Sequence, residues 1–183
     1  MQNRLSLLVV LFMVFVGHAQ ESFSLNSEST LKINGSSTIH DWTVEANSIK
    51  GSMEVIGEEI KEMLFQVDVA KINSERGAAM DKKMHAALKK EEHPQVSFKL
   101  QEVKEVPEAV NTLNLKGLLT IAGVGKVVEI TSQFQKEDGH YSFKGTKEIA
   151  LKDYNMVPPT AMFGQIIVGD DVTVDFDLVF AKK

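Results

Sequence analysis

The chain has 183 residues, a formal net charge of −5 and no cysteine. The acidic balance argues against a nucleic-acid partner, or an anionic membrane surface, held by charge. The lack of cysteine excludes disulfides, thiolate metal sites and cysteine-based catalysis.

The N-terminus has the pattern of a secretory signal peptide. Arg4 precedes an apolar run over residues 5–16, and Gly17-His18-Ala19 places small residues at the −3 and −1 positions of a cleavage site. The run is short for a membrane span, which makes a retained anchor the weaker alternative. We therefore expect residues 1–19 to be removed and residues 20–183 to form one periplasmic or secreted domain without a stable membrane anchor.

Before residue 70 the apolar residues alternate with polar ones, which predicts strands with one buried face. The first covers residues 31–39 and is interrupted at Asn34-Gly35. The second covers residues 42–46 and can continue over 49–55. The third, residues 63–69, alternates without a break.

One helix is predicted near residues 79–91. Met80, Met84 and Leu88 recur at the spacing of one helical face, and lysines fill the opposite side. After Pro94 the apolar period falls to two, so a strand follows directly. The helix thus interrupts a chain that otherwise reads as strand.

The C-terminal half predicts further strands joined by short turns. These cover residues 113–121, 128–134, 141–151 and 172–180, and the last alternates most regularly. Residues 152–169, with two adjacent prolines near the centre, are expected to be irregular.

About eight strands with hairpin links favour an all-β fold, either an antiparallel sandwich or a closed barrel. The one-sided alternation favours the barrel, and a barrel of eight strands can fill itself or hold one small ligand. The expected inward side chains carry no obligatory polar centre, so any ligand should be apolar. The residues expected to be buried on this face are Phe65, Val67, Phe98, Leu100, Leu119, Ile121, Ile130, Phe134, Phe143, Ile149, Val174 and Phe176.

Four segments, in this order, resemble the YceI-like, polyisoprenoid-binding family. They are GSSTIHDWTVEA (35–46), MDKKMHAALKKEEHPQVSFKL (80–100), GLLTIAGVGKVVEI (117–130) and LKDYNMVPPTAMFG with VGDDVTVDFDL (151–178). The resemblance implies a periplasmic or secreted, lipocalin-like barrel of eight antiparallel strands around an elongated apolar tunnel for an isoprenoid chain. It implies no catalytic residues and no cofactor, so the chain is not expected to be an enzyme.

The ligand is expected to be a polyprenyl quinone or polyprenyl phosphate type of lipid, held by inward strand residues and by a lid. Met84 and Leu88 on the helix, and Met156, Met162 and Phe163 in the long connection, are the lid candidates, and Trp42 is a candidate for closing one end. The predicted ligand-binding residues are Trp42, Phe65, Val67, Met84, Leu88, Phe98, Leu100, Leu119, Ile121, Phe134, Phe143, Ile149, Met156, Met162, Phe163, Val174 and Phe176.

Two other function classes remain open beside the lipid carrier. A hydrolase would need convergent polar groups; His40 and Asp41 are adjacent, but neighbours in a strand point to opposite faces. His85 and His93 lie on opposite sides of a helix end, so no metal site is expected. A secreted structural or interaction module would instead need an exposed apolar patch and no cavity.

Overall fold

The computed structural model describes residues 20–74, 77–137 and 139–183. The predicted signal peptide, residues 1–19, lies outside the described residues. In chain order the elements are β1 Gln20–Leu25, β2 Thr30–Ser37, β3 Asp41–Ala46, β4 Ile49–Ile56, β5 Glu59–Asp68, η1 Val69–Lys71, β6 Ile72–Ser74, α1 Ala78–Ala87, β7 Gln95–Glu105, β8 Thr112–Ile121, β9 Val124–Glu137, β10 His140–Ala150, η2 Leu151–Tyr154, β11 Thr160–Ala161, η3 Met162–Gly164 and β12 Ile166–Lys182.

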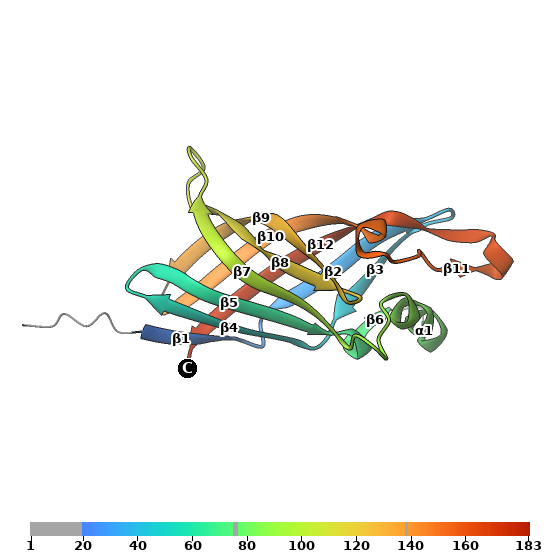
Figure 1. Cartoon of the computed structure of the whole chain (residues 1–183), viewed down its shortest axis with the longest axis horizontal. Coiled ribbons are helices and arrows are strands. Elements are labelled where there is room, and N and C mark those ends of the chain that lie inside the picture. Colours follow the sequence, from blue (N-terminus) through green and yellow to red (C-terminus); the bar gives the residue numbers. More distant parts are fainter. Residues whose placement is uncertain (1–19, 75–76, 138) are drawn as a thin grey trace, which may run out of the picture.

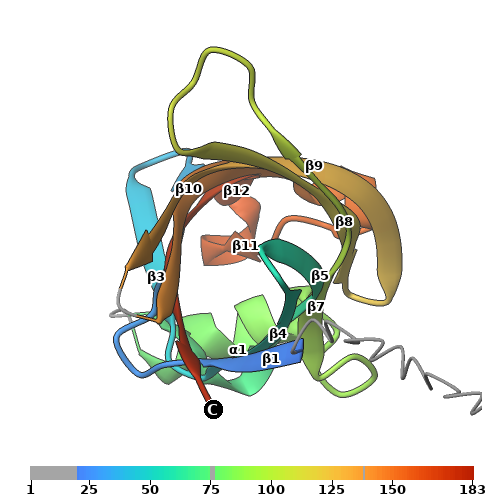
Figure 2. The same cartoon turned by 90° about the vertical axis from the view of Figure 1, so that its left-hand side faces the viewer.

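Eight of the strands form a closed antiparallel barrel, as the alternation predicts (Figures 1 and 2). The order around the ring is β1, β4, β5, β7, β8, β9, β10 and β12, and β12 closes it by pairing with β1. Each strand turns its apolar side inward, which buries those side chains and leaves no free edge around this part of the sheet.

The strands β2, β3 and β6 continue the barrel wall beyond β1, β4 and β5. Because β12 has 17 residues, it pairs with β1 near its C-terminus and with β2 over Val168–Asp177. β3 then pairs with β2, and β6 pairs with β3. The extension ends at β6, and α1 lies beside this edge (Figure 1).

Side chains of α1 bind the backbone of β6. Asp81 Oδ1 accepts hydrogen bonds from the Ser74 amide and hydroxyl, both at 2.8 Å, and His85 Nε2 lies 2.8 Å from the Ile72 carbonyl oxygen. Burial acts to raise the pKa of Asp81, but the hydrogen bonds from Ser74 and Asn73, together with nearby His85, outweigh it, so the pKa lies below its usual range. These contacts hold the helix at one end of the barrel.

Some local predictions differ from the structure. β1 was not expected, since its six residues QESFSL carry only two apolar side chains. β2 runs through Asn34-Gly35 without a break, and β3 and β4 are separate strands because they pair with different neighbours. The helix begins at Ala78 and ends at Ala87, and hydrogen-bonded turns replace its predicted last turn.

Candidate functional site: an apolar cavity with one closed end

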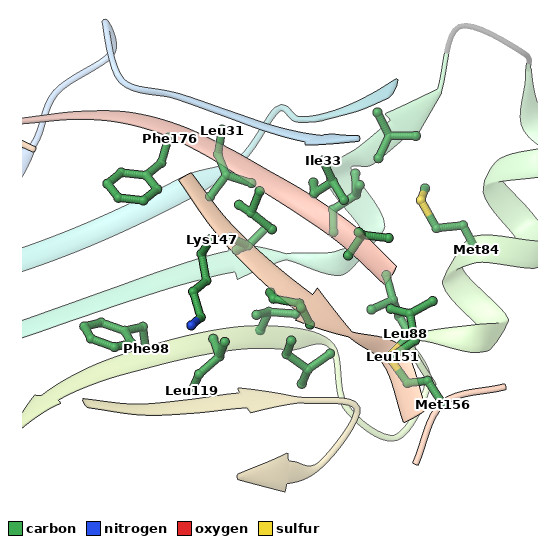
Figure 3. A pocket seen from close by; sticks show the side chains of 18 of the residues that line it. Leu31, Ile33, Met84, Leu88, Phe98, Leu119, Lys147, Leu151, Met156 and Phe176 are labelled. Atoms are coloured by element: carbon green, nitrogen blue, oxygen red, sulfur yellow. The ribbon is translucent and has the colours of Figure 1, made fainter. Parts of the chain in front are cut away.

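The barrel encloses a cavity of about 250 Å³ lined mostly by apolar side chains (Figure 3). On β10 the lining extends from Phe143 to Ile149 and continues to Leu151 at the start of η2. At about 3.3 Å per residue, with the tilt of roughly 40° usual in such barrels, this span corresponds to roughly 20 Å along the barrel axis. The cavity is therefore long enough to hold an extended chain.

Several side chains that point into the cavity are only half-buried. Ile33, Ile130, Val174 and Phe176 line it and pack against the core, yet they retain accessible surface. Ile130, Val174 and Phe176 were expected to be buried, but they face a hollow, and so does Ile33, for which the sequence analysis made no prediction. A filled barrel would bury them completely, so the partial exposure identifies the space available to a ligand.

An aromatic cluster closes the end of the cavity nearest β1. The rings of Phe23 and Tyr141 meet edge to face with centroids 4.8 Å apart, and those of Phe143 and Phe180 do so at 5.8 Å. Phe134 packs against both Tyr141 and Phe143. All of these rings except that of Phe134 are at most 2% exposed, so the interior is filled here and the cavity ends against them.

The opposite end of the cavity is bordered by α1 and by the connection between β10 and β12, which we call the mouth. Met84 on α1 and Leu88 directly after it line one side, and Leu151 and Met156 line the other (Figure 3). The two sides are joined directly, because Lys83 Nζ donates a hydrogen bond of 2.6 Å to the Thr160 carbonyl oxygen.

The wall between β9 and β10 is incomplete toward the mouth. The two strands pair only where residues 133–137 face residues 140–144. Beyond this point Lys147 Nζ donates to the Glu129 carbonyl oxygen at 3.1 Å, and Lys126 forms an ion pair with Asp153 at 3.7 Å. Side chains, not strand pairing, therefore close this seam.

Lys147 is a lining residue that the sequence analysis passed over (Figure 3). It is separated from Phe143 and from Ile149 by an even number of positions on β10, so it lies on the same face of the strand. The alternation alone was therefore enough to predict that Lys147 points inward. The expectation that the inward residues include no polar group was therefore incomplete, because Lys147 is one of them. The long stem can lie along an apolar wall while its amine reaches a carbonyl group at the seam.

Trp42, the only tryptophan of the chain, lies beside the mouth-end strands and lines the cavity. Its indole packs on Gly35, where an added Cβ would lie 2.1 Å from Trp42 Cζ2. Trp42 Nε1 donates a hydrogen bond of 2.9 Å to the Ser36 carbonyl oxygen. Gly35 is thus required by the close approach of the ring.

Most of the predicted ligand-binding residues line the cavity. They are Trp42, Phe65, Val67, Met84, Leu88, Phe98, Leu119, Ile121, Phe143, Ile149, Met156, Val174 and Phe176. The structure adds residues of the same inward parity that the prediction left out, including Leu31, Ile33, Val44, Met63, Leu115, Val172 and Leu178.

Four predicted residues lie elsewhere. Leu100 is buried in the core, and Phe134 belongs to the aromatic cluster. Met162 and Phe163 were expected to cover the mouth as part of a lid, but both are exposed to solvent. Their backbones have positive φ angles of 50° and 56°, in a turn that points them away from the cavity.

The polar candidates do not converge on the cavity. His40 Nδ1 lies 3.3 Å from the Ser37 hydroxyl, in the turn between β2 and β3. Among the described residues no group of three or more histidine, aspartate or glutamate side chains could hold a metal ion. In the same part of the chain, no helix has the length and apolar character needed to cross a membrane.

Comparison with known proteins identifies relatives of this barrel. Residues 18–180 match the family model of the YceI-like domain. No curated protein matches the sequence.

Solved structures share the fold at low sequence identity. BcnA of Burkholderia cenocepacia is 19% identical with a TM-score of 0.69, over 84% of this chain and 96% of that one. A polyisoprenoid binding domain from Saccharophagus degradans, described as implicated in plant cell wall breakdown, is 16% identical with a TM-score of 0.71, over 89% of this chain and 99% of that one. The YceI protein of Campylobacter jejuni is 19% identical with a TM-score of 0.56, over 68% and 74% of the two chains.

Proposed function

The chain belongs to the YceI-like domain family, and on this basis we propose that its cavity binds an apolar lipid, a polyisoprenoid of the polyprenyl quinone or polyprenyl phosphate type. The protein acts as a carrier or scavenger, without catalysis, after export to the periplasm or the medium and removal of residues 1–19. Residues 20–183 form the single lipid-binding domain. The relative from Saccharophagus degradans, which is described as polyisoprenoid-binding, supports this choice of ligand.

The observation that carries the proposal is an apolar cavity that is long, closed at one end and lined along its length by aliphatic and aromatic side chains. Transfer of a hydrocarbon chain from water into such a space is favourable by about 0.8 kcal/mol for each buried CH₂ group. The ligand needs no charged contact to be held. The closed end limits how much of the chain enters, so selectivity should depend on chain length more than on the head group.

Extraction of lipid from the purified protein tests the proposal. Protein exported by its own host is purified without detergent, and native mass spectrometry is recorded before and after organic extraction. We expect a mass difference that matches a prenyl lipid in the extract, and uptake of a polyprenyl quinone from detergent micelles by the extracted protein. A folded protein that carries no lipid and takes up none would refute the proposal.

A further inference from the structure

The mouth end of the barrel carries exposed apolar side chains that take no part in the cavity. We call them the apolar tip and define it as Ile39, Val157, Met162, Phe163 and Ile167. Val157 is 81% exposed, Met162 is 64% exposed and Phe163 is 108% exposed, so most of their surface lies in water. Clustered apolar side chains in this state commonly mark an interaction site.

Backbone hydrogen bonds join the segments that carry the tip. The Thr38 amide donates to the Ile167 carbonyl oxygen at 3.0 Å, and Thr38 Oγ1 donates to the Gln165 carbonyl oxygen at 3.3 Å. The short strand β11 pairs with the start of β12, which places Thr160 opposite Ile167. The turn after β2 and the connection before β12 thus form one protruding unit (Figure 1).

The connection that carries four of the five tip residues contains no charge. Residues 156–169, MVPPTAMFGQIIVG, contain no charged side chain, although charged residues make up 25% of the chain. The protein as a whole is acidic. A partner that binds here is therefore recognised by its apolar character and not by its charge.

The same segment also contributes to the cavity. Met156, Pro159 and Val168 line it, while Val157, Met162 and Ile167 point to solvent. Thr160 is held to α1 by Lys83, so the tip lies directly beside the mouth. Apolar surface therefore continues from the tip to the entrance of the cavity.

We propose that the apolar tip docks the mouth onto a lipid bilayer, with Met162 and Phe163 inserted among the acyl chains, so that the ligand passes between membrane and cavity without crossing water. The inference rests on the proposed lipid-binding function and names the source of the ligand. A bilayer accepts a convex apolar protrusion without matching its shape. Protein partners instead hold anchor residues in well-packed pockets of matching shape, which a bilayer does not need to provide.

Binding to vesicles tests the proposal in the folded, full-length mature protein. Phosphatidylcholine vesicles are mixed with the wild type and with a Met162→Asn, Phe163→Asn double variant, since asparagine tolerates positive φ angles. The control is Val110→Asn, because Val110 is 84% exposed in the turn between β7 and β8. We expect the double variant to lose about tenfold or more in vesicle partitioning, while the control changes by less than about twofold.

Two further measurements distinguish the bilayer from other partners. Partitioning of the wild type should change little between low and high salt, because residues 156–169 carry no charge and phosphatidylcholine has no net charge. Equal partitioning of the wild type and the double variant would overturn the proposal. A change in oligomeric state on substitution, measured by sedimentation, would also overturn it, since a second copy would then cover the tip.

Loading experiments separate this inference from the function on which it rests. The double variant should take up a polyprenyl quinone from detergent micelles to the same extent as the wild type, but about tenfold more slowly from vesicles. Equal rates from vesicles would overturn docking while leaving the carrier function standing. Failure of the wild type to load from micelles would instead overturn the carrier function.

Discussion

A single hydroxyl group placed inside the cavity should weaken lipid binding measurably. Ile33 lies on β2, lines the cavity and is half-buried because it faces the hollow (Figure 3). Its register partners are Val174 on β12 and Val44 on β3, both of which are apolar and line the same cavity. A hydroxyl at position 33 would therefore have an apolar side chain directly opposite it on each neighbouring strand.

The comparison is between Ile33→Thr and Ile33→Val. Threonine and valine have nearly the same shape and both favour strands, so the two variants differ by one hydroxyl in place of one methyl group. In the empty protein, water in the cavity can solvate the hydroxyl. A bound chain expels this water, and stranding a hydroxyl in an apolar site costs roughly 1 to 3 kcal/mol. The dissociation constant of Ile33→Thr should then exceed that of Ile33→Val by about 5-fold to about 150-fold.

Fluorescence of Trp42 provides the assay, because the only tryptophan of the chain lines the cavity. Each variant is titrated with geranylgeraniol, a neutral prenyl alcohol, and thermal unfolding confirms that both are folded. Val127→Thr serves as the control for an added hydroxyl, since Val127 faces solvent on β9. Equal affinities of the two Ile33 variants would show that the chain does not contact this wall, and the reasoning would be wrong.

Three further predictions concern the mouth and the helix. Gly35→Val should displace the indole of Trp42, because no space exists for the added side chain. The fluorescence emission of Trp42 should shift to longer wavelength, and urea titrations should show an unfolding free energy lower by about 1 to 3 kcal/mol. Lys83→Met removes the hydrogen bond to the Thr160 carbonyl oxygen, which joins the two sides of the mouth. If this bond contributes about 1 kcal/mol to holding the mouth closed, lipid release measured by stopped-flow fluorescence should be about fivefold faster. An unchanged rate would mean that this contact does not hold the mouth. The pKa of Asp81 is lower in the folded state than its reference value of 3.8, so its contribution to stability is present above that value and is lost as the pH falls through the lowered pKa. The protection factors of the α1 amides, which are exchange rates corrected for their intrinsic pH dependence, should therefore fall in acid. Asp81→Asn should remove most of this acid-dependent fall and leave the protection factors lower at neutral pH.

The alternation of apolar and polar residues predicted an antiparallel all-β fold with one helix and favoured a barrel over a sandwich, and the resemblance to the YceI-like family implied the barrel. Strand 172–180 and its neighbours each have one apolar face, which a sandwich of two sheets or a closed barrel can bury. The change of period at Pro94 located the helix to within a few residues of its observed ends. These features are local, because the direction of a side chain in a strand depends on its parity alone.

What the inward residues face was decided by the tertiary structure. Phe134 and Phe176 each lie on the apolar face of their strand, yet the first packs in the aromatic cluster and the second lines the cavity. The difference depends on the register between strands distant in sequence, which sets the height of each side chain along the barrel. Parity carries no information about that height.

The positions of Met162 and Phe163 also required the tertiary structure. Their segment follows two prolines and has neither a helical nor a strand period, so no pattern in the sequence specified the direction of its side chains. Pairing of β11 with β12, together with the hydrogen bonds that Thr38 Oγ1 donates to the Gln165 carbonyl oxygen and accepts from the Ile167 amide, places both residues in the exposed turn. The sequence alone therefore determined which residues are apolar and which strands have a buried face. Only the long-range pairing decided which of those apolar residues enclose a cavity and which face the solvent, because these positions depend on contacts between segments far apart in the chain.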